Sequence, residues 1–134
     1  MSDGTGGEVP RLLPGSWEED STGQVRLLGT RCGQCATLTF PPASACPHCW
    51  EHHDLASEVL PEPGVVHSFS VVHVPEDGIE APYTIGWVDF PGGIRVCGRI
   101  RGPDVAVGDP VRVIAGLIRD RGENSLRGWM FEHD

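Results

Sequence analysis

Four cysteines constrain the possible folds of this chain more than any other feature of its sequence. Cys32 and Cys35 are separated by two residues, ten residues follow, and Cys46 and Cys49 repeat the same spacing. Each Cys-x-x-Cys unit can place two thiolates on one metal ion, and four thiolates complete a tetrahedral shell with no open position. A segment this short buries too little apolar surface to fold alone, so a metal would supply its folding energy. The spacing therefore predicts a structural Zn²⁺ site.

Other interpretations of the cysteines remain open on the spacing alone. Iron in a rubredoxin-like site is the competing metal, and two disulfides or free thiols are the alternatives without metal. Five cysteines cannot all pair with one another, which argues against the disulfide framework of a secreted protein. His48, His52 and His53 lie close in sequence, but four cysteines already fill the shell. Cys97 stands alone in a predicted strand and is expected to act as a small hydrophobic residue.

The charge of the chain argues against nucleic acid as a partner. The net charge is −9, and the basic residues are all arginines. Proteins that bind nucleic acid normally carry a basic surface. No apolar run approaches the roughly 18 residues of a membrane span, and the N-terminus lacks an apolar signal core. We therefore expect a cytoplasmic protein with no membrane partner.

Composition divides the chain into three parts. Residues 1–26 are rich in Gly, Ser, Pro and acids, which predicts a flexible N-terminal arm. Trp17 is the exception, because a lone tryptophan in such an arm usually docks on its own domain or on a partner. Residues 27–54 contain the cysteines and form the predicted zinc ribbon. Residues 55–134 contain short strands separated by turn residues.

Six runs rich in valine and isoleucine predict the strands of the third part. Between residues 94 and 101, apolar residues alternate with polar ones, which indicates a strand with one solvent-exposed face. The Pro91–Gly93 turn predicts that strands 83–90 and 94–101 form a hairpin. A chain of short strands with no convincing helix suits a small closed barrel of the OB-fold type, and a small open β-sandwich is the alternative. The runs are 55–60, 65–74, 83–90, 94–101, 111–118 and 126–132.

Several motifs in joint order resemble a known family. They are Arg31-Cys32-Gly33-Gln34-Cys35, Phe40-Pro41-Pro42, Cys46-Pro47-His48-Cys49, the run 64–73, Ala81-Pro82-Tyr83 and the run 108–113. Over about residues 27–118 the chain resembles the bacterial and archaeal zinc-ribbon/OB-fold proteins that accompany thiolase-like enzymes. The resemblance implies a mostly β protein, with an N-terminal rubredoxin-like zinc ribbon followed by a C-terminal OB-fold. The family usually carries an amphipathic helix before the ribbon, and residues 1–26 do not predict one.

The same resemblance implies a function. Members are non-catalytic accessory or scaffold subunits of thiolases, synthases or retro-aldolases that make or cleave carbon–carbon bonds in acyl-CoA thioesters, in lipid or steroid metabolism. The catalytic residues belong to the thiolase-fold partner, which also binds most of the CoA thioester, while the small subunit can help to shape the CoA or acyl tunnel. We therefore expect no catalytic residue here. The alternatives are an OB-fold protein that binds single-stranded nucleic acid and a stand-alone acyl-thioester enzyme.

Three groups of residues outside the cysteines are candidate contacts. The first group is the solvent-exposed face of one strand, formed by Arg95, Arg99 and Arg101. These arginines could contact a CoA phosphate or an acidic partner, or they could simply face solvent. The long connection before strand 83–90 is a candidate partner or ligand loop, with Ile79, Ala81, Pro82 and Tyr83 as its contact residues. Trp17, Trp129 and Phe131 are candidate interface anchors, although core packing of the last strand is the first expectation for Trp129 and Phe131.

Overall fold

The computed structural model describes residues 9–75, 78–102, 104–122 and 125–134. Within these ranges the chain forms β-strands and no α-helix, so no described helix could cross a membrane. The strands are β1 (Trp17–Glu19), β2 (Val25–Cys32), β3 (Leu38–Thr39), β4 (Leu55–Val59), β5 (Gly64–Val72), β6 (Tyr83–Phe90), β7 (Ile94–Arg101), β8 (Pro110–Arg119) and β9 (Leu126–His133).

The last five strands close into a small barrel in the order β5-β6-β7-β9-β8. The β7–β9 pair is parallel and short, and the other pairs are antiparallel. This closure confirms the expected OB-type barrel and excludes the open sandwich. The predicted hairpin is also confirmed, because β6 and β7 pair from Thr84↔Ile100 to Phe90↔Ile94.

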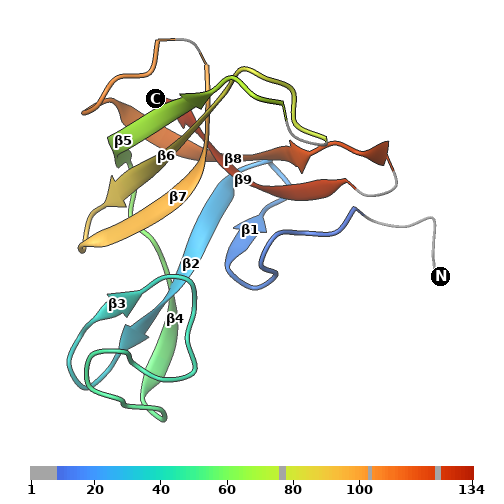
Figure 1. Ribbon diagram of the computed structural model, residues 1–134. Helices are drawn as coiled ribbons and strands as arrows, with labels where there is room; N and C mark the ends of the chain where they lie inside the picture. The colour runs from blue at the N-terminus through green and yellow to red at the C-terminus, as the bar shows by residue number, and fades with distance from the viewer. Residues whose placement is uncertain (1–8, 76–77, 103, 123–124) are drawn as a thin grey trace, which may run out of the picture.

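A second sheet is built around β2. Its strand β1 pairs with the first part of β2, whereas β3 and β4 pair with the second part, all antiparallel. Figure 1 shows β3, β4 and the end of β2 projecting from the barrel, with β2 running from one unit into the other. A single strand thus carries the cysteine segment away from the barrel.

Alternating residues of the barrel strands fill its interior. Val88 and Phe131 are fully buried, and Ile94, Val96 and Ile100 of β7 are buried as the alternation predicts. Burial of such side chains is the main favourable term in folding, at roughly 25 cal/mol per Å² of apolar surface. Trp129 belongs to the same core and meets Phe40 of the ribbon edge-on, with ring centroids 5.6 Å apart. The ribbon is therefore packed against the barrel and not merely tethered to it.

The structure corrects the expectation of a loose N-terminal arm. Residues 1–8 lie outside the described part, but Trp17 begins β1 and is only 2% exposed. Its indole N–H donates to the Leu12 carbonyl oxygen at 2.6 Å, and the Arg11 guanidinium lies 4.0 Å from its ring centroid. Val25 and Leu27 share its apolar cluster. The scattered apolar residues of this segment form part of the core.

The expected boundaries between the three parts also move. The boundary placed between residues 26 and 27 falls inside β2, which starts at Val25. The boundary placed between residues 54 and 55 precedes β4, but β4 pairs with β2 and belongs to the ribbon sheet. The barrel itself starts at Gly64, where β5 begins.

Candidate metal centre and barrel cavity

Two similar turns bring the four cysteines together. In the first, the Ala36 N–H donates to the Cys32 carbonyl oxygen at 3.0 Å, and in the second, the Trp50 N–H donates to the Cys46 carbonyl oxygen at 2.9 Å. Ala36 and Trp50, each directly after a cysteine pair, adopt positive φ of 65° and 67°. This left-handed conformation reverses the chain tightly enough to point both thiols of a pair to one side.

The four sulfur atoms have the spacing that a tetrahedral metal needs. They all lie within 4.8 Å of one another, with Cys32 Sγ 3.5 Å from Cys49 Sγ and Cys35 Sγ 3.6 Å from Cys46 Sγ. A tetrahedron with Zn–S bonds of about 2.3 Å has edges of about 3.8 Å. The Gln34 N–H also donates to Cys32 Sγ at 3.4 Å, a bond that favours a thiolate. The donor set therefore fits a structural zinc ion.

The thiols differ in acidity when no metal holds them. The Thr37 side chain, 3.1 Å from Cys35 Sγ, and the Thr37 backbone lower the pKa of Cys35 to about 6. A backbone hydrogen bond at Glu51 lowers the pKa of Cys49, but burial and the other three cysteines outweigh it and raise that pKa to about 12. Four thiolates so close together require a cation between them.

This difference predicts how zinc binding depends on pH. The raised pKa of Cys49 keeps that thiol protonated in the metal-free chain at pH 7.5, so zinc binding should release protons. Zinc retention should fall as the pH is lowered, because protons compete with zinc for the four thiolates. Calorimetry in two buffers of different ionisation enthalpy measures the released protons, and a metal-indicator dye measures retained zinc. Binding without proton release, or retention that does not change between pH 7.5 and pH 4.5, would contradict the site.

The three candidate arginines of β7 have different surroundings. Arg95 donates from Nε to Asp89 Oδ1 at 2.6 Å, which lowers the pKa of Asp89, and Arg101 lies 3.8 Å from Glu132. Arg99 is half-buried, lies over the Tyr83 ring and donates to the Ile118 carbonyl oxygen at 3.5 Å. The three arginines stand at alternating positions of β7, and Arg99 is the one of the three that lines the cavity described next.

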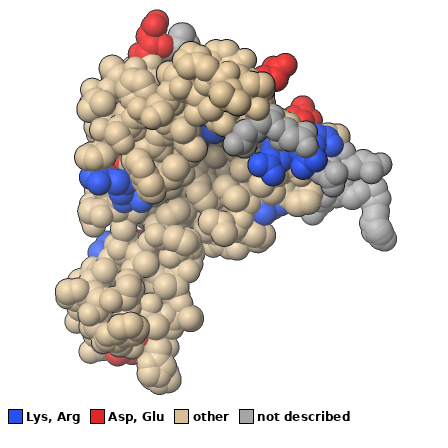
Figure 2. Space-filling model, in the orientation of Figure 1, with Lys and Arg blue, Asp and Glu red and all other residues tan. Residues whose placement is uncertain are grey.

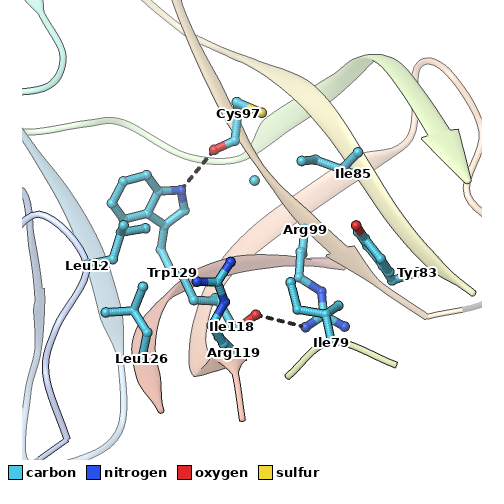
Figure 3. A pocket seen from close by; sticks show the side chains of 11 residues that line it. Leu12, Ile79, Tyr83, Ile85, Cys97, Arg99, Ile118, Arg119, Leu126 and Trp129 are labelled. Carbon is cyan, nitrogen blue, oxygen red and sulfur yellow. Dashed lines mark hydrogen bonds between the residues drawn. The ribbon is translucent and has the colours of Figure 1, made fainter. Parts of the chain in front are cut away.

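That cavity has a volume of about 360 Å³ and lies beside β6 and β7. Two of the four loop candidates, Ile79 and Tyr83, line it together with Arg99, whereas Ala81 and Pro82 do not. Figure 3 shows Trp129 and Leu126 on one side of the cavity, Tyr83 and Ile85 on the other, and the two arginines Arg99 and Arg119 between them. The structure thus brings together residues from two of the candidate groups, the loop before β6 and the arginines of β7, in the lining of one cavity.

The candidate anchors are core residues in this structure. Trp17, Trp129 and Phe131 are 2%, 6% and 0% exposed, so none offers a protruding side chain to a partner. The physical reason is that β1 and β9 both turn these rings into the apolar cluster that joins the two units. Trp129 also lines the cavity, and its N–H donates to the Cys97 carbonyl oxygen at 3.2 Å.

Sequence reasoning missed several lining residues of the cavity. Leu12 comes from the segment expected to be loose, and Ile118, Arg119 and Leu126 come from the facing ends of β8 and β9. The apolar ends of these two strands were visible in the sequence, but the β8–β9 pairing that brings them together was not. Trp50 was also not singled out; it is 76% exposed at the end of the second cysteine turn.

Comparisons with known proteins identify the family in which this combination of ribbon and barrel occurs. The sequence model of the ChsH2 rubredoxin-like zinc ribbon domain matches residues 23–55, and that of the ChsH2 C-terminal OB-fold domain matches residues 58–115. A DUF35 domain-containing scaffold protein of Methanocaldococcus jannaschii is 32% identical over 105 residues, which span 75% of this chain and 74% of that protein. The chain belongs to the ChsH2 (DUF35) family. The predicted rubredoxin-like ribbon and its structural zinc are thereby supported, and the resemblance read from the motifs is confirmed.

Two further relatives bear on function. The benzoylsuccinyl-CoA thiolase subunit BbsA of Thauera aromatica is 34% identical over 98 residues, or 70% of this chain. The match spans 66% of BbsA, just under two thirds of its length. A solved structure described as an Ltp2–ChsH2(DUF35) aldolase aligns with a TM-score of 0.62 and 29% identity, over 81% of this chain and 84% of the matched one. These relatives are described as a subunit, a scaffold or one part of an aldolase.

Proposed function

We propose that this chain is a non-catalytic accessory subunit of a thiolase-type or aldolase-type complex that makes or cleaves carbon–carbon bonds in acyl-CoA thioesters. The observation that carries the proposal is its match, over most of its length, to proteins described as one component of such enzymes. The partner would be a thiolase-fold enzyme in the cytoplasm, and it would bind most of the CoA thioester. Neither nucleic acid nor membrane is part of the proposal.

The chemistry of the described residues supports a non-catalytic role. Four thiolates close the zinc shell, so the metal has no position for substrate. Burial raises the pKa of the Cys97 thiol, which makes it a poor nucleophile. His67 lies 3.2 Å from Asp89, but within the described ranges no serine, threonine or cysteine hydrogen-bonds to His67. A nucleophile with its base, which a stand-alone acyl-thioester enzyme needs, is not assembled there.

Two parts of the structure are suited to hold a partner. The ribbon is a stiff extension, because zinc would cross-link its two turns and Phe40 anchors it on the barrel. Figure 2 shows that most of the face drawn is uncharged on both units, with arginines in separate places. We assign the ribbon as the docking module. The side of the barrel with Ile79, Tyr83 and Arg99 would lie nearest to the shared active site.

A pull-down with enzymology tests this function. Tagged full-length chain should co-purify from its source cells with a thiolase-fold enzyme identified by mass spectrometry. The chain alone should show no turnover of acyl-CoA thioesters, and the purified partner should gain activity on adding it. A partner that is fully active without the chain, or turnover by the chain alone, would overturn the proposal. Single-stranded DNA and RNA serve as negative binding controls.

A further inference from the structure

The two cysteine turns have the same backbone hydrogen bond but differ in the exposure of their cysteines. Cys32 and Cys46, the first cysteine of each turn, are both 2% exposed. The second cysteines differ, because Cys35 is half-buried whereas Cys49 is exposed. Residues 47–50 of the second turn are all exposed. Cys49 is therefore the cysteine of the cluster that a small dissolved molecule reaches most readily.

Cys49 also has a second thiol within reach. Its sulfur lies 3.5 Å from Cys32 Sγ, which belongs to the other turn, and Cys35 Sγ lies 3.6 Å from Cys46 Sγ in the same way. A bond between Cys49 and Cys32 would therefore join the two turns instead of closing one of them. Cysteines bind zinc as thiolates, which is also the form that reacts with oxidants. An exposed thiolate with a second thiol beside it is typical of cysteines that are oxidised reversibly.

We propose that Cys49 is a site of oxidative modification by hydroperoxides, and that the product is a Cys32–Cys49 disulfide. The Cys49 thiolate attacks the hydroperoxide oxygen that carries the hydrogen, the O–O bond breaks, and an alkoxide or hydroxide ion leaves. Cys49 then carries a sulfenic acid. The Cys32 thiolate attacks the Cys49 sulfur, the S–S bond forms, and hydroxide leaves. The two sulfur atoms together lose two electrons, and these reduce the peroxide.

This modification would empty the metal site. The disulfide removes two of the four sulfur donors and leaves only Cys35 and Cys46, whereas a structural zinc site needs four ligands. The disulfide keeps the two turns linked, and a thiol can reduce it again, so the change is reversible. The inference concerns the ribbon of the isolated chain and does not depend on the proposed function.

Hydrogen peroxide, added to the zinc-loaded full chain without reductant, tests the proposal. A metal-indicator dye follows zinc release, and pepsin digestion with tandem mass spectrometry locates the disulfide. The first disulfide should be Cys32–Cys49, zinc should be released as it forms, and a dithiol with added zinc should reverse both changes. A first disulfide within one turn, such as Cys46–Cys49, would overturn the proposal. First oxidation at Cys97, retention of zinc by the oxidised chain, or no disulfide at all would also overturn it.

Two matched variants assign the attacking sulfur to Cys49. Cys49→His keeps a zinc ligand but removes the exposed thiolate, so peroxide should release zinc about tenfold more slowly. Cys35→His makes the same exchange at the half-buried position and keeps both reacting sulfurs, so its rate should stay within about twofold of the unaltered chain. Equal rates for the two variants would overturn the assignment. The disulfide map of the unaltered chain needs no variant, so it decides the proposal even where a variant fails to bind zinc.

Discussion

Replacement of Cys46 by serine should abolish zinc binding and unfold the ribbon while leaving the barrel folded. Cys46 is only 2% exposed, and its sulfur is one of the four that surround the site. Structural zinc in such segments supplies roughly 10–16 kcal/mol of apparent binding energy, which a sheet of short strands cannot replace. Zinc per chain should fall from one to near zero, and the amides of β3 and β4 should lose their protection from hydrogen exchange.

Cys97→Ser is the matched control for this variant. Cys97 lies on β7, outside the cysteine cluster, so its replacement should leave zinc content and ribbon protection unchanged. Mass spectrometry under native conditions counts the bound zinc, and hydrogen exchange locates the unfolding. A Cys46→Ser chain that retains one zinc, or a ribbon that stays protected without it, would show that the metal does not hold this segment together.

Replacement of Trp17 by alanine should destabilise the whole chain by about 3–5 kcal/mol, the usual cost of removing a buried tryptophan side chain. Trp17 is almost fully buried, packs with Val25 and Leu27 and donates a hydrogen bond to the Leu12 carbonyl oxygen. Removal leaves a cavity at the junction of ribbon and barrel. Urea denaturation of zinc-loaded chains, followed by far-ultraviolet circular dichroism, measures the change.

The neighbouring residue provides the control for Trp17. Glu18 is exposed on β1 and pairs only loosely with Arg26, at 4.0 Å, so Glu18→Ala should change the free energy of unfolding by no more than about 0.5 kcal/mol. If Trp17→Ala proves as stable as Glu18→Ala, the N-terminal segment is the loose arm that its composition suggests.

Local signals predicted the metal site and part of the barrel well. The cysteine spacing determines which thiols can meet, because each pair is held by one turn of a few residues. The β6 and β7 strands also have the predicted bounds, since the Pro91–Gly93 turn separates two alternating runs. In both cases the residues that form the feature are close together in the sequence.

Features that depend on distant segments were not predictable in the same way. The apolar residues of 9–27 look sparse in the sequence and become core only because β1 pairs with β2. The three arginines look equivalent until the strand register puts Asp89 opposite Arg95. The cavity needs Leu12, Ile79 and Leu126 at one place, and only the closed barrel brings them there.

One measurement tests the central claim, that a zinc-held ribbon lets this chain attach to a thiolase-fold enzyme. The zinc-loaded chain and the chain stripped of zinc by a chelator are each titrated calorimetrically into the purified partner. The loaded chain should bind tightly, the stripped chain should bind at least a hundredfold more weakly, and added zinc should restore binding. Equal affinity of the loaded and stripped chains would contradict the claim.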